Sequence, residues 1–133
     1  MTYVVGEAIP ATLKGEITRE QLRAYADASG DINPIHLNEK FAKEAGFPSV
    51  IAHGMLSAAF LGDYILEHFP ENTFRLEKFK VRFKKITLPG DLITCVGKIK
   101  SIDKERSIIA TIATTNQKGE ETTSGEATLS TIN

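Results

Sequence analysis

The chain has 133 residues, of which 41% are hydrophobic and 25% charged, with a formal net charge of -1 and a single cysteine. This length and composition are typical of one globular domain, so residues 1–133 are interpreted as a single domain. The balanced charge and the lack of a long apolar run argue against nucleic acid or a membrane as a partner. The lone Cys95 excludes an intrachain disulfide, and without a basic leader sequence we expect a cytoplasmic protein.

The first part of the chain shows signals for a short strand and then a helix. Residues 11–17 predict the strand, and Thr18 with Gln21 forms a capping box that begins the helix. Gly30 suits the left-handed position that ends a helix. This helix is therefore expected to deliver Asp31 at its C-terminal end.

Two further helices are predicted before the strands begin. Asn38 is expected to cap a short helix that Gly46 ends, and a longer helix runs from near His53 to about His68. The longer helix has apolar residues on nearly all faces, which is typical of a buried helix at the centre of a core. In the short helix the expected buried stripe consists of Phe41, Ala42 and Ala45.

From Phe74 onward the apolar residues alternate with a period of two, which indicates β-strands. The alternation slips near residues 77–78, and such a slip predicts a β-bulge. Three more strands are expected at residues 92–102, 107–115 and 122–132, with short turns that predict an antiparallel meander of four strands. The class is therefore α+β, with one buried helix against a curved antiparallel sheet. The other face of the sheet and its edges would still need cover, which predicts a homodimer.

The stretch at residues 29–36 combines ionisable groups with a rigid turn. Pro34 fixes its own backbone and keeps Asn33 out of helical geometry, so Asp31 and His36 can be held on one wall of a cavity. A carboxylate and a neutral imidazole that share one water make a general acid–base pair near neutral pH. Asn33 would support either side chain by hydrogen bonding.

Two other interpretations of this stretch stay open. Asp after Gly, and Asn before Pro, are common in turns and caps, and a single His is often a structural residue. Asp31, His36 and His53 are also conceivable metal ligands. Their spacing matches no standard zinc pattern, so no metal is expected.

A second polar-to-apolar junction follows at residues 52–55. Gly54 lies where the buried helix starts, so its amide is among those without an intrahelical partner. Such an amide suits the oxygen of a polarised carbonyl, and glycine lets a ligand approach closely. The alternative is a simple helix start with His53 as cap or donor. An acid–base pair together with an oxyanion donor is a recognisable catalytic set.

These motifs resemble those of a known family. Residues 25–36 resemble the hydratase-2 signature of (R)-specific enoyl-CoA hydratases and MaoC-like dehydratases, which have the hot-dog fold. Residues 52–55 are similar to the second motif of that family, and residues 83–91 and 125–127 resemble its strand motifs. The resemblance covers roughly residues 3–131 in the same order.

The resemblance implies a fold, a reaction and a site. The fold is a curved antiparallel sheet wrapped around a central helix, in a homodimer whose sheets join back to back with acyl tunnels near the interface. The reaction is reversible syn hydration of a trans-2-enoyl-CoA to the (R)-3-hydroxyacyl-CoA, without a cofactor. Asp31 and His36 are the implied catalytic pair, and the Gly54 amide would bind the thioester oxygen. The implied substrate-binding residues are Asn33, His53, Met55 and Ser57.

The chain also departs from part of the pattern. Some relatives carry a serine about eight residues after the His-Gly-Met motif, whereas residues 58–62 contain none and Ser57 is the only hydroxyl on that early turn. Three alternatives stay open within the fold: a dehydratase for substrates on acyl carrier protein, a non-catalytic acyl-thioester-binding protein, and a thioesterase. The Asp-x-Asn-Pro-x-His motif favours the hydratase.

Six basic residues gather within residues 75–85, with Glu77 as the one acidic residue among them. A solvated strand face that discourages edge aggregation explains most of these charges. One or two of them are alternatively expected to attract a phosphorylated carrier, either CoA or acyl carrier protein. The six residues are Arg75, Lys78, Lys80, Arg82, Lys84 and Lys85.

Overall fold

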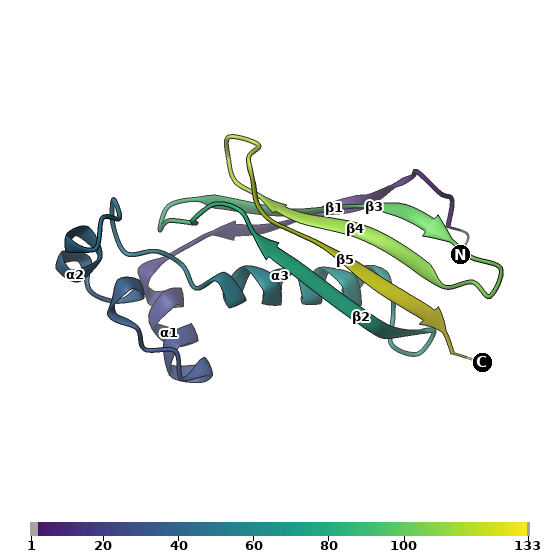
Figure 1. The fold of residues 1–133 in the computed structure, drawn as a ribbon, viewed down its shortest axis with the longest axis horizontal. Helices are drawn as coiled ribbons and strands as arrows, with labels where there is room; N and C mark the ends of the chain where they lie inside the picture. The colour runs from purple at the N-terminus through teal and green to yellow at the C-terminus, as the bar shows by residue number, and fades with distance from the viewer. Residues whose placement is uncertain (1–2, 133) are drawn as a thin grey trace.

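The computed structural model describes residues 3–132, which form a five-stranded antiparallel sheet curved over one long helix (Figure 1). Two shorter helices lie at one end of the sheet, away from the two chain ends (Figure 1). This arrangement confirms the predicted α+β class and the central helix. Within residues 3–132, no helix is both long enough and apolar enough to span a membrane. The elements are β1 (Ala8–Glu16), α1 (Arg19–Ser29), the 3-10 turn η1 (Pro34–His36), α2 (Glu39–Glu44), α3 (Gly54–His68), β2 (Phe74–Phe83), β3 (Leu92–Ile102), β4 (Ile108–Thr115) and β5 (Glu121–Thr131).

The strand order is β1-β3-β4-β5-β2, which confirms the consecutive pairing of the last three strands. The prediction that β2 starts the same meander is wrong, because β2 pairs with β5 at the edge of the sheet. Hydrogen bonds explain the difference. Ile17 N–H donates to Asp91 O at 2.9 Å and Ile17 O accepts from Gly90 N–H at 2.8 Å, so the turn before β3 is held beside β1. Residues 84–91 therefore cross the end of the sheet instead of turning back on β2.

The predicted bulge in β2 is present. The pairing with β5 shifts between Leu76 and Lys78, near the position where the alternation of apolar residues slips. Leu76 lies opposite Leu129 and Phe79 lies opposite Ala127, and both partners belong to the buried core. The bulge thus keeps the apolar residues of β2 on the face toward α3.

Helix α3 supplies the centre of the main core, but it is not buried on all sides. Leu61, Tyr64 and Ile65 have no exposed surface and pack against the sheet. Met55 and Leu66, in contrast, are 59% and 45% exposed, because the sheet covers only one side of this helix. The sheet residues of this core are Ile9, Phe74, Cys95, Ile99, Ile108, Ala110, Ile112, Ala127 and Leu129.

Cys95 is part of this core, as predicted. Its side chain has no exposed surface, and its Sγ lies 3.7 Å from the carbonyl oxygen of Phe60. Burial raises the pKa of the thiol to about 11. The thiol therefore stays protonated near neutral pH and behaves as a small apolar side chain.

The predicted caps at the starts of α1 and α2 are present, but one of them is incomplete. Thr18 Oγ1 accepts from Gln21 N–H at 3.1 Å, but the Gln21 Oε1 atom is buried without a partner, so the reciprocal half of the capping box is missing. Asn38 caps α2 by accepting from Phe41 N–H at 3.0 Å. The expected three-residue stripe of α2 is wrong, since Ala42 is buried while Phe41 is 45% exposed. A helix of six residues presents little more than one side chain to the core beneath it.

Candidate active site

Backbone hydrogen bonds bring the two junctions of the sequence together. Ile51 N–H donates to Ile35 O at 3.0 Å, and His36 Nδ1 lies 2.7 Å from Ile51 O. Ala52 N–H donates to Thr87 O at 2.8 Å and so ties the same link to the segment after β2. Because the carbonyl oxygen of Ile51 can only accept a hydrogen bond, Nδ1 of His36 carries a proton and donates it to this oxygen. In the neutral ring, Nε2 then holds the lone pair.

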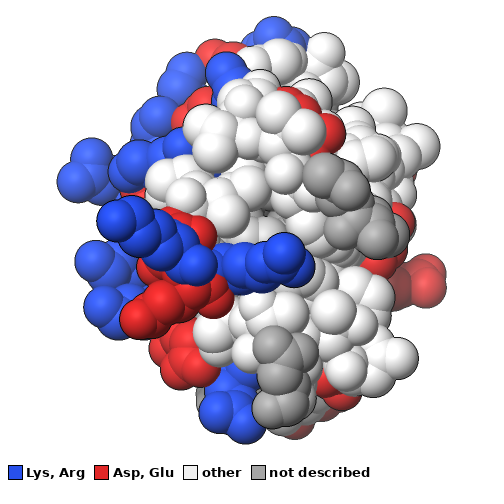
Figure 2. Space-filling model, turned by 90° about the vertical axis from the view of Figure 1, so that its right-hand side faces the viewer, with Lys and Arg blue, Asp and Glu red and all other residues white. Residues whose placement is uncertain are grey.

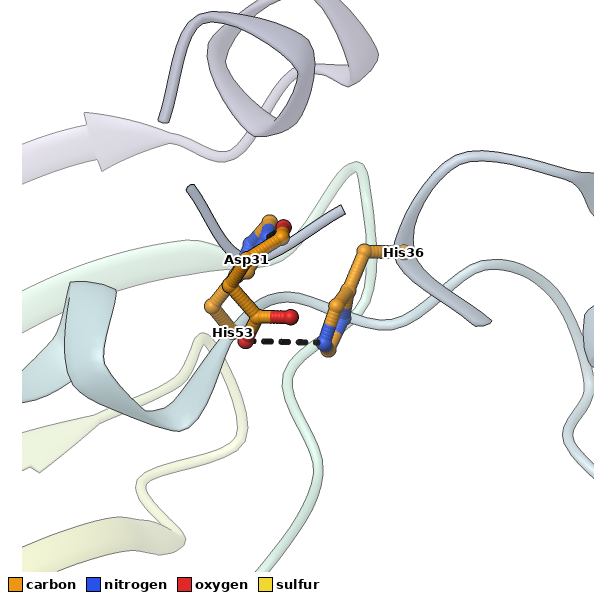
Figure 3. A group of neighbouring side chains, drawn as sticks. All are labelled: Asp31, His36 and His53. Atoms are coloured by element: carbon orange, nitrogen blue, oxygen red, sulfur yellow. Dashed lines mark hydrogen bonds and ion pairs between the residues drawn. The ribbon is translucent and has the colours of Figure 1, made fainter. Parts of the chain in front are cut away.

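Asp31 lies at the solvent-exposed rim of the site, directly after the left-handed Gly30. Its Oδ1 atom accepts from Asn33 N–H at 3.3 Å, and its own N–H donates to Ser29 Oγ at 3.1 Å. The other oxygen, Oδ2, lies 3.8 Å from His36 Nε2, and Figure 3 shows this carboxylate pointing toward the imidazole. The Asp31 side chain is 53% exposed and that of His36 is 9% exposed. The structure therefore brings the two predicted ionisable groups face to face.

Asn33 holds the turn between them. Its Oδ1 accepts from Ile35 N–H at 3.1 Å and caps η1, whose first residue is Pro34. A proline at this position suits a helical start because its missing N–H has no helical partner in any case. The side chain of Asn33 thus fixes the backbone between Asp31 and His36.

His53 is a buried neighbour of both groups, with 1% of its surface exposed. Its Nε2 lies 3.0 Å from the Asp31 carbonyl oxygen, and its ring stacks on His36 with centroids 3.8 Å apart. The ring of Tyr25 meets it edge-on, with centroids 4.9 Å apart. Burial lowers the pKa of His53, so the ring is neutral near pH 7. Its single proton is on Nε2, because the Asp31 carbonyl oxygen can only accept a hydrogen bond. Its Nδ1 is buried without a hydrogen-bond partner.

Gly54 is the first residue of α3, and the side chain of the preceding His53 makes no capping hydrogen bond. The Gly54 amide is therefore among the helix-start donors that have no intrahelical acceptor. A Cβ atom at this position would lie 3.0 Å from Cε1 of Phe83. A larger residue at this position would therefore force the Phe83 ring to shift by a few tenths of an ångström, a constraint that the sequence does not reveal.

A cavity of about 320 Å³ lies beside these groups. It is lined by four of the residues predicted for the site: His36, His53, Gly54 and Ser57. Asp31 and Asn33 lie outside this lining, and Met55 points to solvent with 59% exposure. The remaining lining comes from the link before α3, the end of β2, the segment after it and β5: Ile51, Ala52, Phe83, Lys84, Lys85, Ile86, Thr87 and Thr123.

Sequence reasoning missed Phe83, Thr87 and Thr123 as residues of the cavity. Period-two alternation says which face of a strand a residue takes, but not which distant loop that face meets. The resemblance of residues 83–91 to a family motif was the available signal.

The geometry of the three titratable groups favours an acid–base pair over a metal centre. Ligand atoms of Asp31, His36 and His53 lie within 4.8 Å of one another. The two imidazoles are nearly parallel, with an interplanar angle of 23°, and each already lies against a backbone carbonyl. The nitrogen lone pairs of the two stacked rings lie in nearly parallel planes, so they do not point at one common metal ion.

The basic residues around β2 fall into two groups. Lys84 pairs with Glu121 at 3.0 Å and Lys85 with Glu120 at 2.6 Å. Figure 2 shows Lys and Arg gathered along one side of the molecule, interrupted by acidic side chains. Within residues 3–132, four basic residues of β2 have no acidic group within 4 Å: Arg75, Lys78, Lys80 and Arg82.

Comparison with known proteins identifies the family. Residues 3–122 match the family described as MaoC like domain. The chain belongs to the MaoC-like family. It is 29% identical to the (R)-specific enoyl-CoA hydratase of Rhodospirillum rubrum over 94% of this chain and 87% of that protein. It is 46% identical to 3-hydroxyacyl-thioester dehydratase X of Mycobacterium tuberculosis over 56% of this chain, but only 25% of that longer protein.

Solved structures agree with this membership. The (R)-hydratase from A. caviae involved in PHA biosynthesis superposes with a TM-score of 0.87 at 25% identity, over 97% of both chains. R-hydratase PhaJ1 from Pseudomonas aeruginosa superposes with a TM-score of 0.83 at 26% identity, over 96% of this chain and 81% of that one. This MaoC-like chain therefore has the expected hot-dog fold and belongs among hydratases and dehydratases.

Proposed function

We propose that this protein catalyses the reversible syn hydration of a trans-2-enoyl-CoA to the (R)-3-hydroxyacyl-CoA. The observation that carries the proposal is the 3.8 Å separation of Asp31 Oδ2 from His36 Nε2, at the rim of a cavity lined by Gly54. Two groups at this separation can hold one water between them. The similarity to an (R)-specific enoyl-CoA hydratase supports the same reaction.

The hydrogen bonds suggest how the water would be held. His36 donates through Nδ1 to Ile51 O, so its Nε2 accepts, and Asp31 Oδ2 also accepts. A water that donates to both atoms has a lone pair left for the β-carbon of the substrate. Asp31 acts as the general base toward this water, and His36 positions it and helps to pass a proton onward.

Addition of the water shifts the π electrons of the double bond toward the thioester. The new C–O bond forms at the β-carbon, and negative charge develops on the thioester oxygen. The free amide of Gly54 at the start of α3 would stabilise this charge. The α-carbon then takes the proton delivered by the Asp31–His36 pair, so the sum is addition of one water. Because the Asp31–His36 pair delivers both the hydroxyl group and the proton from the same side of the double bond, the addition is syn.

A second candidate is the dehydration of 3-hydroxyacyl chains bound to acyl carrier protein. The similarity to 3-hydroxyacyl-thioester dehydratase X supports this direction, and the same groups serve a reversible reaction. A non-catalytic acyl-binding role is less favoured, because a binding site needs no paired Asp31 and His36 beside a free helix-start amide.

The test is an assay of crotonyl-CoA with the purified protein. We expect loss of the enoyl-thioester absorbance band without release of free thiol, because hydration leaves the thioester intact. Thiol release would instead indicate a thioesterase, and binding without either change would indicate an acyl-binding protein. The same acyl group on acyl carrier protein, compared by kcat/KM, separates the two carriers.

We further propose that the active form is a homodimer joined along β2. Edge strand β2 exposes Leu76 and Phe79, and the open side of α3 exposes Met55 and Leu66. Burial of these apolar side chains against a second copy would also cover the free strand edge. The outer face of the sheet carries charged residues, so the expected back-to-back contact is less favoured than this edge contact.

Light scattering on the purified protein should therefore give twice the mass of one chain. Phe79→Lys is expected to shift the protein toward monomer, because it places a charge in the apolar contact. The control, Lys80→Glu, changes the charge on the neighbouring, outward-facing residue and should leave the dimer intact. A wild-type protein that stays monomeric at micromolar concentration would contradict the proposal.

A further inference from the structure

His53 contacts both partners of the proposed acid–base pair, yet it is itself almost completely buried. Its Nε2–H donates to the backbone oxygen of Asp31 at 3.0 Å, and its ring stacks on His36 at 3.8 Å. It also directly precedes Gly54, the first residue of α3. One imidazole thus touches or adjoins every group to which the proposed reaction gives a role.

We propose that His53 is a positioning residue that holds Asp31 and His36 in reacting geometry, and not a ligand of the substrate. The proposal rests on the hydration reaction proposed above. It differs from the sequence-based expectation, in which His53 contributes to substrate binding.

Asp31 needs such support because its other hydrogen bonds are local. Its N–H contacts Ser29 and its Oδ1 contacts Asn33, both two residues away, whereas the bond from His53 comes from 22 residues away. The Asp31 side chain is 53% exposed, so packing does little to hold it. The His53 bond is therefore the contact that ties the Asp31 backbone to the start of α3.

His36 needs support of a different kind. Its Nδ1 bond to Ile51 O fixes one edge of the ring but leaves rotation about that bond as a possible motion. The flat face of His53, at an interplanar angle of 23°, limits this rotation. Tyr25 meets the His53 ring edge-on and keeps it in place. The plane of His36, and hence the direction of its Nε2 lone pair, follows from this stack.

The burial of His53 agrees with a structural rather than a chemical part in the reaction. Only 1% of its surface is exposed, and burial lowers its pKa, so it stays neutral while a proton moves between Asp31 and His36. A neutral ring can stack on His36 whether that ring is neutral or charged. A second charged imidazole at 3.8 Å would repel it.

Two substitutions distinguish the effect of the hydrogen bond from His53 Nε2 to Asp31 O from the effect of the side-chain volume alone. Glutamine carries an N–H donor at about the position of the imidazole Nε2, whereas leucine fills similar volume without a donor. We expect His53→Leu to lower kcat on the order of a hundredfold with little change in KM, because a misplaced reacting group costs about that much. His53→Gln should recover much of the loss. Thermal unfolding of each variant shows whether the fold is retained.

Several outcomes would overturn the proposal. A raised KM with unchanged kcat in His53→Leu would indicate that His53 binds the substrate. Equal losses of kcat in His53→Leu and His53→Gln would show that the Nε2 hydrogen bond has no part in positioning. If the wild-type protein hydrates no enoyl thioester, the proposed function itself fails, independently of His53.

A second measurement does not depend on activity or on the variants. The chain has three histidines, so long-range ¹H–¹⁵N spectra give three resolvable imidazoles. The wild-type protein should show His53 as a neutral Nε2–H tautomer at neutral pH, and His36 with its proton on Nδ1. An Nδ1–H tautomer or a charged ring at His53 would contradict the hydrogen bond to Asp31.

Discussion

Asp31→Asn is expected to reduce crotonyl-CoA hydration by about a thousandfold while leaving the fold intact. The amide can still accept from Asn33 N–H through its oxygen, so the turn is kept. Its NH₂ group then replaces Oδ2 and faces Nε2 of His36, 3.8 Å away in the native geometry. A donor at this place cannot take a proton from water and competes for the lone pair of His36. The assay is kcat by loss of the enoyl band, with thermal unfolding beside it.

The matched control is Asp27→Asn, which removes the same charge from an exposed residue of α1 one turn before Asp31. It should leave turnover unchanged. His36→Ala is expected to cost as much as Asp31→Asn, and the double variant little more, because the two groups act as a unit. Near-normal turnover in either purified single variant would show that Asp31 and His36 are not the catalytic acid–base pair.

Gly125→Ala is expected to destabilise the protein by roughly 3 kcal/mol or more, or to prevent folding. Gly125 pairs with Val81 between β5 and β2, and a Cβ atom there would overlap the carbonyl oxygen of Lys80. The obstacle is backbone, so no side-chain rotation relieves it, and β2 must move away from β5. Since β2 ends at Phe83, which lines the cavity, activity should fall together with stability. Urea unfolding followed by circular dichroism measures the loss.

The same substitution at Gly62 serves as the control. Gly62 lies within α3, and a Cβ atom there meets nothing within 4 Å outside its own helix. Gly62→Ala should therefore raise stability by about 0.5 to 1 kcal/mol, because alanine loses less entropy in a helix than glycine. If both variants unfold at the same urea concentration, the steric explanation for Gly125 is wrong.

Local sequence signals predicted most of the elements and the two junctions of the site. The Thr18 and Asn38 caps, the left-handed Gly30 and the β2 bulge each depend on a few neighbouring residues, and each is present. The Asp-x-Asn-Pro-x-His motif is equally local, since its turn is held by bonds between residues two apart. The family resemblance then correctly indicated the hot-dog fold.

Tertiary structure decided the features that join distant segments. The edge position of β2 follows from the bonds of Ile17 to the turn before β3, and no pattern within β2 itself encodes them. The stack of His53 on His36 and the packing of Phe83 on Gly54 likewise arise where separate segments meet. The physical reason is range: caps, turns and alternation act over a few residues, whereas strand order and cavity walls depend on which buried surfaces fit together. The sequence by itself thus determined the reacting groups of the proposed site, and only the folded chain decided what holds them in place.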